Sequence, residues 1–326
     1  MKYIALPNEN SVRRLSFYLA MEEYVARNVD ERDCFFMWQV RPSVIFGRNQ
    51  LIENEVNLDF CRRRGIMTYR RKSGGGCVYA DMKNIMFSYV TDEDNVGFTF
   101  NRYINMVALV LTKLGVDART TGRNDILIGD RKVSGNAFYR LPGRSIVHGT
   151  MLYDTDMENM VGSITPTGEK LMSKGVESVR QRIALLKDYV TIGIEEFKDF
   201  VRQNLCDGVR TLTLDDVQAI ETLEREYLSQ EFVYGNNPRY TVMRRRRIED
   251  VGEMEARVEL KNGIVKDLNL VGDYFLTGDF DGQIVARLRG VPLKREALTE
   301  ALPERVEDVI MNLSRDSLVS LLLGEE

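Results

Sequence analysis

Three stretches of the sequence combine charged side chains with glycines in patterns that suit the binding of an anion. The first, Arg70 to Gly76, reads RRKSGGG and places three cations directly before three consecutive glycines. Glycine lets backbone N–H groups approach a ligand closely, and fixed positive charge favours a phosphate or a carboxylate. A single run of this kind is also typical of a flexible hairpin tip with solvated charges, and alone it favours that interpretation.

The second stretch, Gly122 to Ala137, reads GRNDILIGDRKVSGNA and surrounds one lysine with small and polar residues. If this lysine lies in a strand, Lys132 and Ser134 share one face, because successive side chains of a strand alternate. An ammonium and a hydroxyl would then serve one ligand, although a solvent-facing lysine in a hairpin explains the pattern equally well. Asn124 and Asp125 are either turn residues or oxygen ligands for Mg²⁺.

The third stretch, Val147 to Met151, contains the only histidine of the chain, His148. An isolated histidine in a strand-like segment is more often a hydrogen-bonded core residue than a ligand. A single histidine also excludes a metal site built from several histidines.

Together the three stretches resemble one family. In this order and at these separations, RRKSGGGCVYAD, GRNDILIGDRKVSGNA and HGTMLYD resemble the lipoate-protein ligases of the biotin and lipoate ligase superfamily. GRNQ at Gly47 to Gln50, KGVESVRQR at Lys174 to Arg182 and a C-terminal stretch similar to the accessory domain of these ligases follow in family order. The resemblance therefore covers nearly the whole chain. It implies an enzyme that uses ATP to activate lipoate as lipoyl-AMP and then transfers the lipoyl group to a protein lysine.

The resemblance also implies roles for individual residues. Lys132 matches the catalytic lysine of the family, whose compact charge can stabilise the carboxylate and the α-phosphate during adenylation. Other matching positions surround lipoate or its adenylate. They are Arg71, Ser73, Gly75, Gly76, Ser134, Ala137, His148 and Thr150.

A further set of positions matches the family's ATP site. The backbone at Val78 and Tyr79 is expected near adenine. Asn124 and Asp125 match the stretch near the phosphates and Mg²⁺, with Asp125 as the candidate metal ligand. The adenylate-binding loop, a lid that would shield a water-sensitive mixed anhydride, matches three consecutive residues. These are Ser178, Val179 and Arg180.

Two alternatives to a ligase remain open. Octanoyltransferases share the fold and the lysine but hold the acyl group on a cysteine that follows the lysine motif, and no cysteine occurs between Ala137 and Asn204. Cys77, beside the glycines, and Cys206, in an expected helix, are better explained as small apolar residues. The other alternative is a non-catalytic protein that binds lipoate, against which the retention of Lys132 argues. The ligases often have a histidine where this chain has Ala80, which concerns details of the pocket.

Beyond the motifs, the pattern along the chain predicts an α+β fold. Short strands separated by Gly, Asn and Asp favour hairpins and mixed, largely antiparallel sheets over regular βαβ units. The turn-rich GNNPR at Gly235 to Arg239 predicts a boundary between a catalytic domain of residues 1–239 and a small α+β accessory domain of residues 240–326. In the accessory domain, three strands with an Asn262-Gly263 turn precede helical stripes. Helices are expected at residues 11–27, 58–64, 100–114, 194–205, 214–228, 305–312 and 318–323.

Composition excludes several other classes of protein. The 326 residues are 44% apolar, without the run of roughly 18 apolar residues that spans a bilayer. The N-terminal stretch lacks the apolar core of a signal peptide, so we expect a cytoplasmic protein. Four cysteines without a CxxC pair favour reduced thiols. A net charge of -4 argues against broad binding to nucleic acid.

The resemblance also implies partners. The acceptors would be lipoyl-domain proteins, namely the acyltransferase subunits of 2-oxoacid dehydrogenases and the glycine-cleavage carrier protein, and nothing in the sequence demands more than a monomer. The run Arg244 to Arg247 is best explained as solvated charge near the domain hinge, since alternate arginines of a strand face opposite sides. The other interpretation is a patch that steers acidic acceptor domains to the site.

Overall fold

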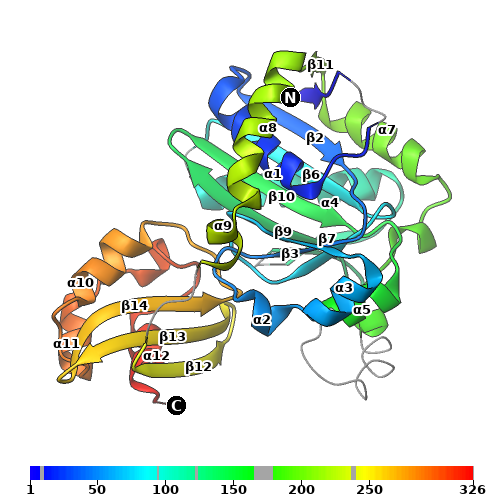
Figure 1. Cartoon of the computed structure of the whole chain (residues 1–326). Coiled ribbons are helices and arrows are strands. Elements are labelled where there is room, and N and C mark those ends of the chain that lie inside the picture. Colours follow the sequence, from blue (N-terminus) through cyan, green and yellow to red (C-terminus); the bar gives the residue numbers. More distant parts are fainter. Residues whose placement is uncertain (8–10, 94, 122–123, 165–178, 236–239, 326) are drawn as a thin grey trace.

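A large mixed sheet forms the centre of the N-terminal half of the molecule (Figure 1). The structure, a computed structural model, describes the chain except for residues 8–10, 94, 122–123, 165–178, 236–239 and 326. In the described part, the strand order is β11-β1-β2-β6-β10-β9-β8-β7, parallel among the first three strands and antiparallel from β2 onward. The strands are β1 (Lys2–Ala5), β2 (Asp33–Trp38), β6 (Ile85–Thr91), β7 (Ala118–Thr120), β8 (Asp125–Ile128), β9 (Arg131–Leu141), β10 (Arg144–Met151) and β11 (Gly208–Thr211).

Helices cover both faces of this sheet. They are α1 (Leu15–Asn28) and α8 (Leu214–Leu228) on one face, and α4 (Val96–Lys113) and α7 (Ile194–Leu205) on the other. Successive residues of β2 show the division, because Phe36 packs in the core with α1 and α8 while Phe35 packs in the core with α4 and α7. The sheet is thus apolar on both faces, and its period of two residues places neighbouring side chains in different cores.

A second, smaller sheet carries the glycine-rich stretch. Its order is β4-β3-β5, with β3 parallel to β4 and antiparallel to β5. Residues 71–77, which we call the glycine loop, connect β4 to β5. Three helices pack against this sheet or beside it. The elements are β3 (Ser43–Phe46), β4 (Met67–Arg70), β5 (Val78–Ala80), α2 (Ile52–Glu55), α3 (Leu58–Arg64) and α5 (Met157–Ile164).

The C-terminal domain is a three-stranded antiparallel sheet with helices packed on one face. Asn262 and Gly263 turn between its last two strands with φ angles of 55° and 75°, as the Asn-Gly pair predicts. The elements are β12 (Val242–Ile248), β13 (Gly252–Lys261), β14 (Ile264–Gly272), a π-helical turn (Asp281–Val285), α10 (Ala286–Leu288), α11 (Arg295–Ala301), a 3-10 turn (Val306–Asp308) and α12 (Arg315–Leu323).

The segment after β14 lies against the glycine loop. The N–H of Gly75 donates to the carbonyl of Tyr274 at 3.1 Å. The ring of Phe275 stacks on that of Phe138 in β9, with centroids 5.6 Å apart, and is 3% exposed. The C-terminal domain therefore packs against the N-terminal half of the molecule through the glycine loop.

The fold confirms the predicted α+β class with a large mixed sheet and a small C-terminal domain. Two expectations were wrong in detail. The strand expected at residues 132–134 continues to Leu141, because residues 134–141 pair with β10 despite Gly135 and Asn136. The helix expected at residues 305–312 is only a 3-10 turn, because the backbone after it bonds instead to Phe275 and Thr277. Tertiary pairing overrides local propensity in both places.

The contact between the domains predicts an asymmetry between two glycines of the same loop. A Cβ atom at Gly74 would overlap the carbonyl oxygen of Tyr274, whereas a Cβ at Gly76 would meet only a side-chain carbon of Asp273 at 3.8 Å. Gly74→Ala should therefore lower the free energy of unfolding by about 1–3 kcal/mol and speed amide exchange in residues 272–276. Gly76→Ala is the matched control for unfolding and exchange, and equal behaviour of the two variants would contradict the described contact.

Candidate active site

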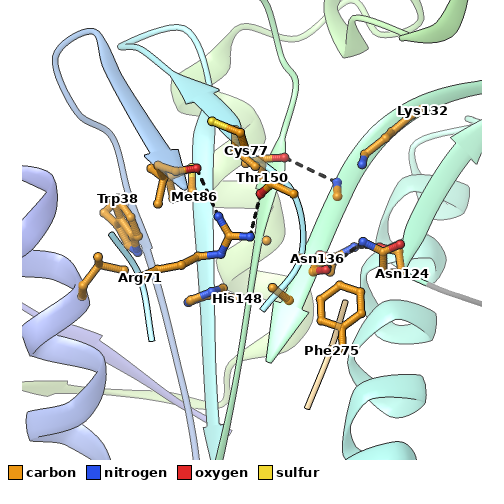
Figure 2. A pocket seen from close by; sticks show the side chains of 18 residues that line it. Trp38, Arg71, Cys77, Met86, Asn124, Lys132, Asn136, His148, Thr150 and Phe275 are labelled. Atoms are coloured by element: carbon orange, nitrogen blue, oxygen red, sulfur yellow. Dashed lines mark hydrogen bonds between the residues drawn. The ribbon is translucent and has the colours of Figure 1, made fainter. Parts of the chain in front are cut away.

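A cavity of about 90 Å³ lies among the two sheets, α1 and the segment after β14. Figure 2 shows Trp38, Arg71 and His148 on one side of it and Lys132, Asn124 and Asn136 on the other. Most residues predicted for the site line this cavity. They are Arg71, Gly75, Gly76, Val78, Asn124, Lys132, Ala137, His148 and Thr150.

The remaining predicted residues lie elsewhere. Ser73 is fully buried behind the cavity wall, and Asp125 reaches the site through its ion pair with Lys132. Tyr79 is 1% exposed in the core of the small sheet. Ser134, Val179 and Arg180 do not line the cavity, and Ser178 lies outside the described residues.

The three cations before the glycines point in three directions. Arg70 donates to the carbonyls of Arg48, Gln50 and Val233, which ties the segment after β3 to residues 230–234. Lys72 forms ion pairs with Glu23 and Glu226 in the direction of α8. Only Arg71 lines the cavity. The difference follows from the alternation of side chains at the end of β4.

Arg71 holds the glycine loop in shape. Its guanidinium donates to the carbonyls of Ile45 at 3.1 Å, Gly74 at 2.6 Å and Gly76 at 2.7 Å. Gly75 has a φ of +85° between these carbonyls, a conformation that side chains with a Cβ rarely adopt. Burial lowers the pKa of Arg71 to about 10, so the group keeps its charge at neutral pH. The guanidinium thus organises the loop instead of extending freely toward a ligand.

Lys132 is the cation that reaches the cavity from the opposite side. Its Nζ lies 2.8 Å from Oδ1 of Asp125, and its side chain is 39% exposed. The end of the lysine chain folds over Gly135, where a Cβ would come within 2.6 Å of Nζ. Gly135 therefore leaves room for the position that the ammonium occupies.

A bulge in β9 separates Lys132 from Ser134. Lys132 stands opposite Leu127 and Ser134 opposite Ile126, so Val133 is the extra residue. Because neighbouring residues of the partner strand face opposite sides, Lys132 and Ser134 do not share a face. The expectation that both serve one ligand was wrong.

Asn136 lines the same wall of the cavity as Lys132, and the sequence analysis did not identify it as a site residue. It donates through Nδ2 to the carbonyl of Asn124 at 3.0 Å, and Asn124 returns a bond to the carbonyl of Asn136 at 3.1 Å. A Cβ at Gly149 would overlap the amide oxygen of Asn136. The signal was available, since a polar residue between Gly135 and Ala137 in a buried strand must find partners.

His148 connects the cavity to a buried carboxylate. Its Nε2 lies 2.7 Å from Oγ of Ser73, and its Nδ1 lies 2.8 Å from Oε2 of Glu22. The arrangement has the geometry of a serine, histidine and carboxylate triad. Ser73 is fully buried, however, and its Oγ accepts from Nε of Arg71 at 2.9 Å. It therefore cannot serve as a nucleophile, and the hydroxyl is a link in a hydrogen-bond network.

Three further residues of the site gave little signal in the sequence. Glu22 could have been suspected, because it lies within the apolar stripe of α1. Trp38 lines the cavity at the end of β2, and Phe275 enters from the C-terminal domain. Neither position carries a local pattern, since each depends on a contact between distant segments.

The chemistry of the remaining groups narrows the function. Cys77 lines the cavity, but burial raises the pKa of its thiol well above the usual range, which disfavours the nucleophilic thiolate. Among the described residues, no group of three or more His, Cys, Asp or Glu side chains could hold a metal ion. The pocket thus offers a partly exposed cation, a glycine loop and apolar walls.

Comparison with known protein families agrees with this description. Residues 15–206 match the model of the lipoyl protein ligase A/B catalytic domain, and residues 237–322 match that of the bacterial lipoate protein ligase C-terminus. Lipoate-protein ligase 1 of Staphylococcus aureus is 34% identical and covers 92% of this chain and 94% of its own. Lipoate-protein ligase LplJ of Bacillus subtilis is 30% identical, with coverages of 93% and 95%.

Solved structures are similar as well. LipL1 of P. falciparum in complex with lipoate has a TM-score of 0.78 and 20% identity, covers 100% of this chain and 99% of its own, and so shares the fold. A bipartite lipoate protein ligase of Thermoplasma acidophilum, described with its E2 lipoyl domain, has a TM-score of 0.65, 28% identity and coverages of 74% and 98%. Lipoate-protein ligase A bound with ATP has a TM-score of 0.62, 26% identity and coverages of 72% and 98%.

The larger part of the chain is therefore a lipoyl protein ligase A/B catalytic domain. The C-terminal domain makes the assignment narrower, and the chain belongs to the lipoate-protein ligase family. The family predicted from the motifs is confirmed.

The packing of Lys132 over Gly135 predicts a selective defect. Gly135→Ala should leave the midpoint of thermal unfolding nearly unchanged, because the added methyl meets only the flexible end of a lysine. Formation of the acyl-adenylate should fall by about tenfold or more as the ammonium is displaced. Because both changes act through one group, adding Gly135→Ala to Lys132→Ala should cause no further loss. Additive losses in adenylate formation would show that Gly135 acts by another route.

Proposed function

We propose that this protein activates lipoate with ATP to give lipoyl-AMP and then transfers the lipoyl group to a lysine of a lipoyl-domain protein. The observation that carries the proposal is one cavity in which Lys132 faces the glycine loop. Positioning and neutralisation of charge are the main demands of adenylation, because the lipoate carboxylate is itself the nucleophile. The family membership supports the same reaction.

The apolar side of the cavity suits the acyl chain. Leu19, Trp38, Ile45 and Met86 line it beside the glycine loop. A saturated chain with a compact ring or methyl end can lie against such walls, which discriminate small differences at that end by about 1–3 kcal/mol. Lipoate and octanoate are therefore both candidates for binding, with lipoate as the proposed substrate.

In the first step, a carboxylate oxygen of lipoate attacks the α-phosphorus of ATP, a P–O bond forms, and pyrophosphate leaves. We assign to Lys132 the stabilisation of negative charge on the carboxylate and the α-phosphate. Asp125 holds the ammonium at 2.8 Å before substrates bind. Mg²⁺ would neutralise the phosphates, and one carboxylate suits a metal that usually binds through substrate phosphates and water. Asp125 is the residue proposed to contact it, with Asn124 nearby.

The ATP side of the proposal rests on two edges of the site. β5 is an edge strand of the small sheet, so the outer backbone groups of Val78 and Tyr79 face away from the ladder with β3. The end of the proposed lid docks on the lysine strand, since Ala184 N–H donates to the carbonyl of Lys132 at 2.8 Å. Val179 and Arg180 lie just before this anchor.

In the second step, the neutral amine of the acceptor lysine attacks the acyl carbonyl, an amide forms, and AMP leaves with the acyl C–O bond broken. The amine proton is released to solvent or to the departing phosphate. No cysteine takes part in this sequence, which agrees with the raised pKa of the Cys77 thiol. The acceptors proposed are 2-oxoacid dehydrogenase acyltransferase subunits and the glycine-cleavage carrier protein.

The proposal includes the organisation and surroundings of the chain. Residues 1–239 would carry both reactions, and residues 240–326 would form the accessory domain. Free thiols at all four cysteines suit the reducing cytoplasm. Among the described helices, none has both the length and the apolar character needed to cross a membrane.

In the arginine run, Arg245 forms an ion pair with Glu253. Arg244, Arg246 and Arg247 lie on the same strand, β12, and are exposed. This exposed positive charge is the basis for predicting that an acidic acceptor docks here.

Lipoate-dependent formation of acyl-AMP from ATP and Mg²⁺, followed by transfer to an added lipoyl domain, tests the reaction directly. Lys132→Ala should reduce adenylate formation by about 10²–10³-fold, the usual effect of removing one group that stabilises transition-state charge. Absence of acyl-AMP with the wild-type protein, combined with acyl transfer from a carrier-protein thioester, would replace the ligase with an octanoyl or lipoyl transferase. Binding of lipoate without either reaction would indicate a non-catalytic relative.

Cys77 provides a separate test of the transferase alternative. Cys77→Ala should retain lipoyl transfer within a few-fold, because the raised pKa of the thiol disfavours the nucleophilic thiolate. For the same reason the wild-type thiol should react slowly with iodoacetamide at neutral pH. Trapping of an acyl group on Cys77 by mass spectrometry, with loss of transfer in the variant, would contradict the proposed mechanism.

A further inference from the structure

A chain of hydrogen bonds leads from one wall of the cavity to a buried carboxylate. The indole Nε1 of Trp38 donates to Oγ of Ser88 at 2.9 Å, and Oγ of Ser88 donates to Oε1 of Glu22 at 2.6 Å. Ser88 and Glu22 are both 0% exposed. Trp38 lines the cavity, whereas Glu22 lies behind it.

A second chain reaches the same carboxylate from the glycine loop. Arg71 donates through Nε to Oγ of Ser73 at 2.9 Å, and this Oγ lies 2.7 Å from Nε2 of His148. Nδ1 of His148 lies 2.8 Å from Oε2 of Glu22. Arg71 and His148 also line the cavity, on the same side as Trp38 (Figure 2).

The chemistry of the end groups fixes the direction of the bonds at both ends of each chain. An indole and a guanidinium can only donate, and a carboxylate can only accept. The hydroxyl of Ser88 accepts from Trp38 and donates to Glu22. The hydroxyl of Ser73 accepts from Arg71 and can donate to Nε2 of His148, which lies 2.7 Å away. Because a carboxylate can only accept, the geometry favours the tautomer of His148 with its proton on Nδ1, next to Glu22.

We propose that Glu22 is a positioning residue that, through Ser88 on one arm and through His148 and Ser73 on the other, sets the orientation of both Trp38 and Arg71. A fully buried carboxylate is costly unless its oxygens are satisfied, and here the two arms satisfy them. The role in lipoate binding rests on the proposed function, while the hydrogen-bond directions do not.

Loss of the carboxylate removes the common acceptor of both arms. In Glu22→Gln the side chain keeps its shape, but its amide can donate as well as accept. His148 is then free to adopt either tautomer, and Ser73 no longer presents a fixed acceptor to Nε of Arg71. The wall against which the acyl chain lies is loosened, whereas Lys132 on the opposite side is untouched.

The sequence supplies a separate reporter for each arm, because His148 is the only histidine and Trp38 the only tryptophan. We would record the imidazole ¹⁵N spectrum and the tryptophan emission of wild-type protein, Glu22→Gln and Glu23→Gln. Glu23 is the matched control. It follows Glu22 on α1, is 3% exposed, and binds Lys72 and Tyr227 instead of the cavity residues. The KM for lipoate and the kcat of adenylate formation complete the measurements.

The proposal expects the Nδ1–H tautomer in wild-type protein and in Glu23→Gln, and a mixture of both neutral tautomers in Glu22→Gln. It also expects the KM for lipoate to rise by about tenfold in Glu22→Gln, the effect of losing one buried hydrogen-bond partner, with kcat within about twofold. An Nε2–H or doubly protonated imidazole in wild-type protein would overturn it, as would equal KM values in the two variants.

A second variant keeps the test open if Glu22→Gln does not fold. Ser88→Ala cuts only the tryptophan arm, so it should shift the emission of Trp38 and weaken lipoate binding by about tenfold while the tautomer of His148 is retained. Unchanged emission and unchanged binding would overturn the proposal. Wild-type protein that bound no lipoate would contradict the proposed function, and the imidazole spectrum would still decide the direction of the hydrogen bonds.

Discussion

The buried guanidinium of Arg71 is the constraint on which the architecture of the site depends. A cation out of contact with water must have its N–H groups satisfied, and here carbonyls of the small sheet and the glycine loop satisfy them. Hydrogen bonds to neutral carbonyls do not cancel the charge of the guanidinium, which therefore remains a cation. The same bonds hold the backbone around it rigid. The loop can then wrap around it only with glycine at the position of positive φ. The glycines are therefore needed first for the loop to fold around Arg71, and the shape of the ligand site follows from that fold.

The wall of the cavity that carries Lys132 is held in a different way. In β9 the position of Lys132 is set by an extra residue in the ladder and by the absence of a side chain at Gly135. One wall is thus held by buried polar bonds and the other keeps an exposed, adjustable ammonium. This division suits a site that must hold an acyl chain still while charge moves between a carboxylate and a phosphate.

The sequence predicted those parts of the molecule whose signals are local. The motif around Lys132 and the glycines at 74–76 carry their chemistry in adjacent residues, and the helix at residues 194–205 has its period and its ends within its own length. Other features arise only when distant segments meet. The bulge at Val133 depends on the register with β8, and Phe275 reaches the site across the domain contact. Arg70 and Lys72 resemble Arg71 in the sequence, and only the fold distinguishes their roles.

The stacking of Phe275 on Phe138 ties the evolution of the two domains together. The ring from the C-terminal domain fills a space bounded by β9 and by Phe100 of α4, so a change in volume at one position must be matched at another. Positions 100, 138 and 275 should therefore covary among relatives. A C-terminal domain transplanted from a relative with a different residue at 275 would leave a gap or a clash beside the glycine loop, unless the residues at 100 and 138 were exchanged with it.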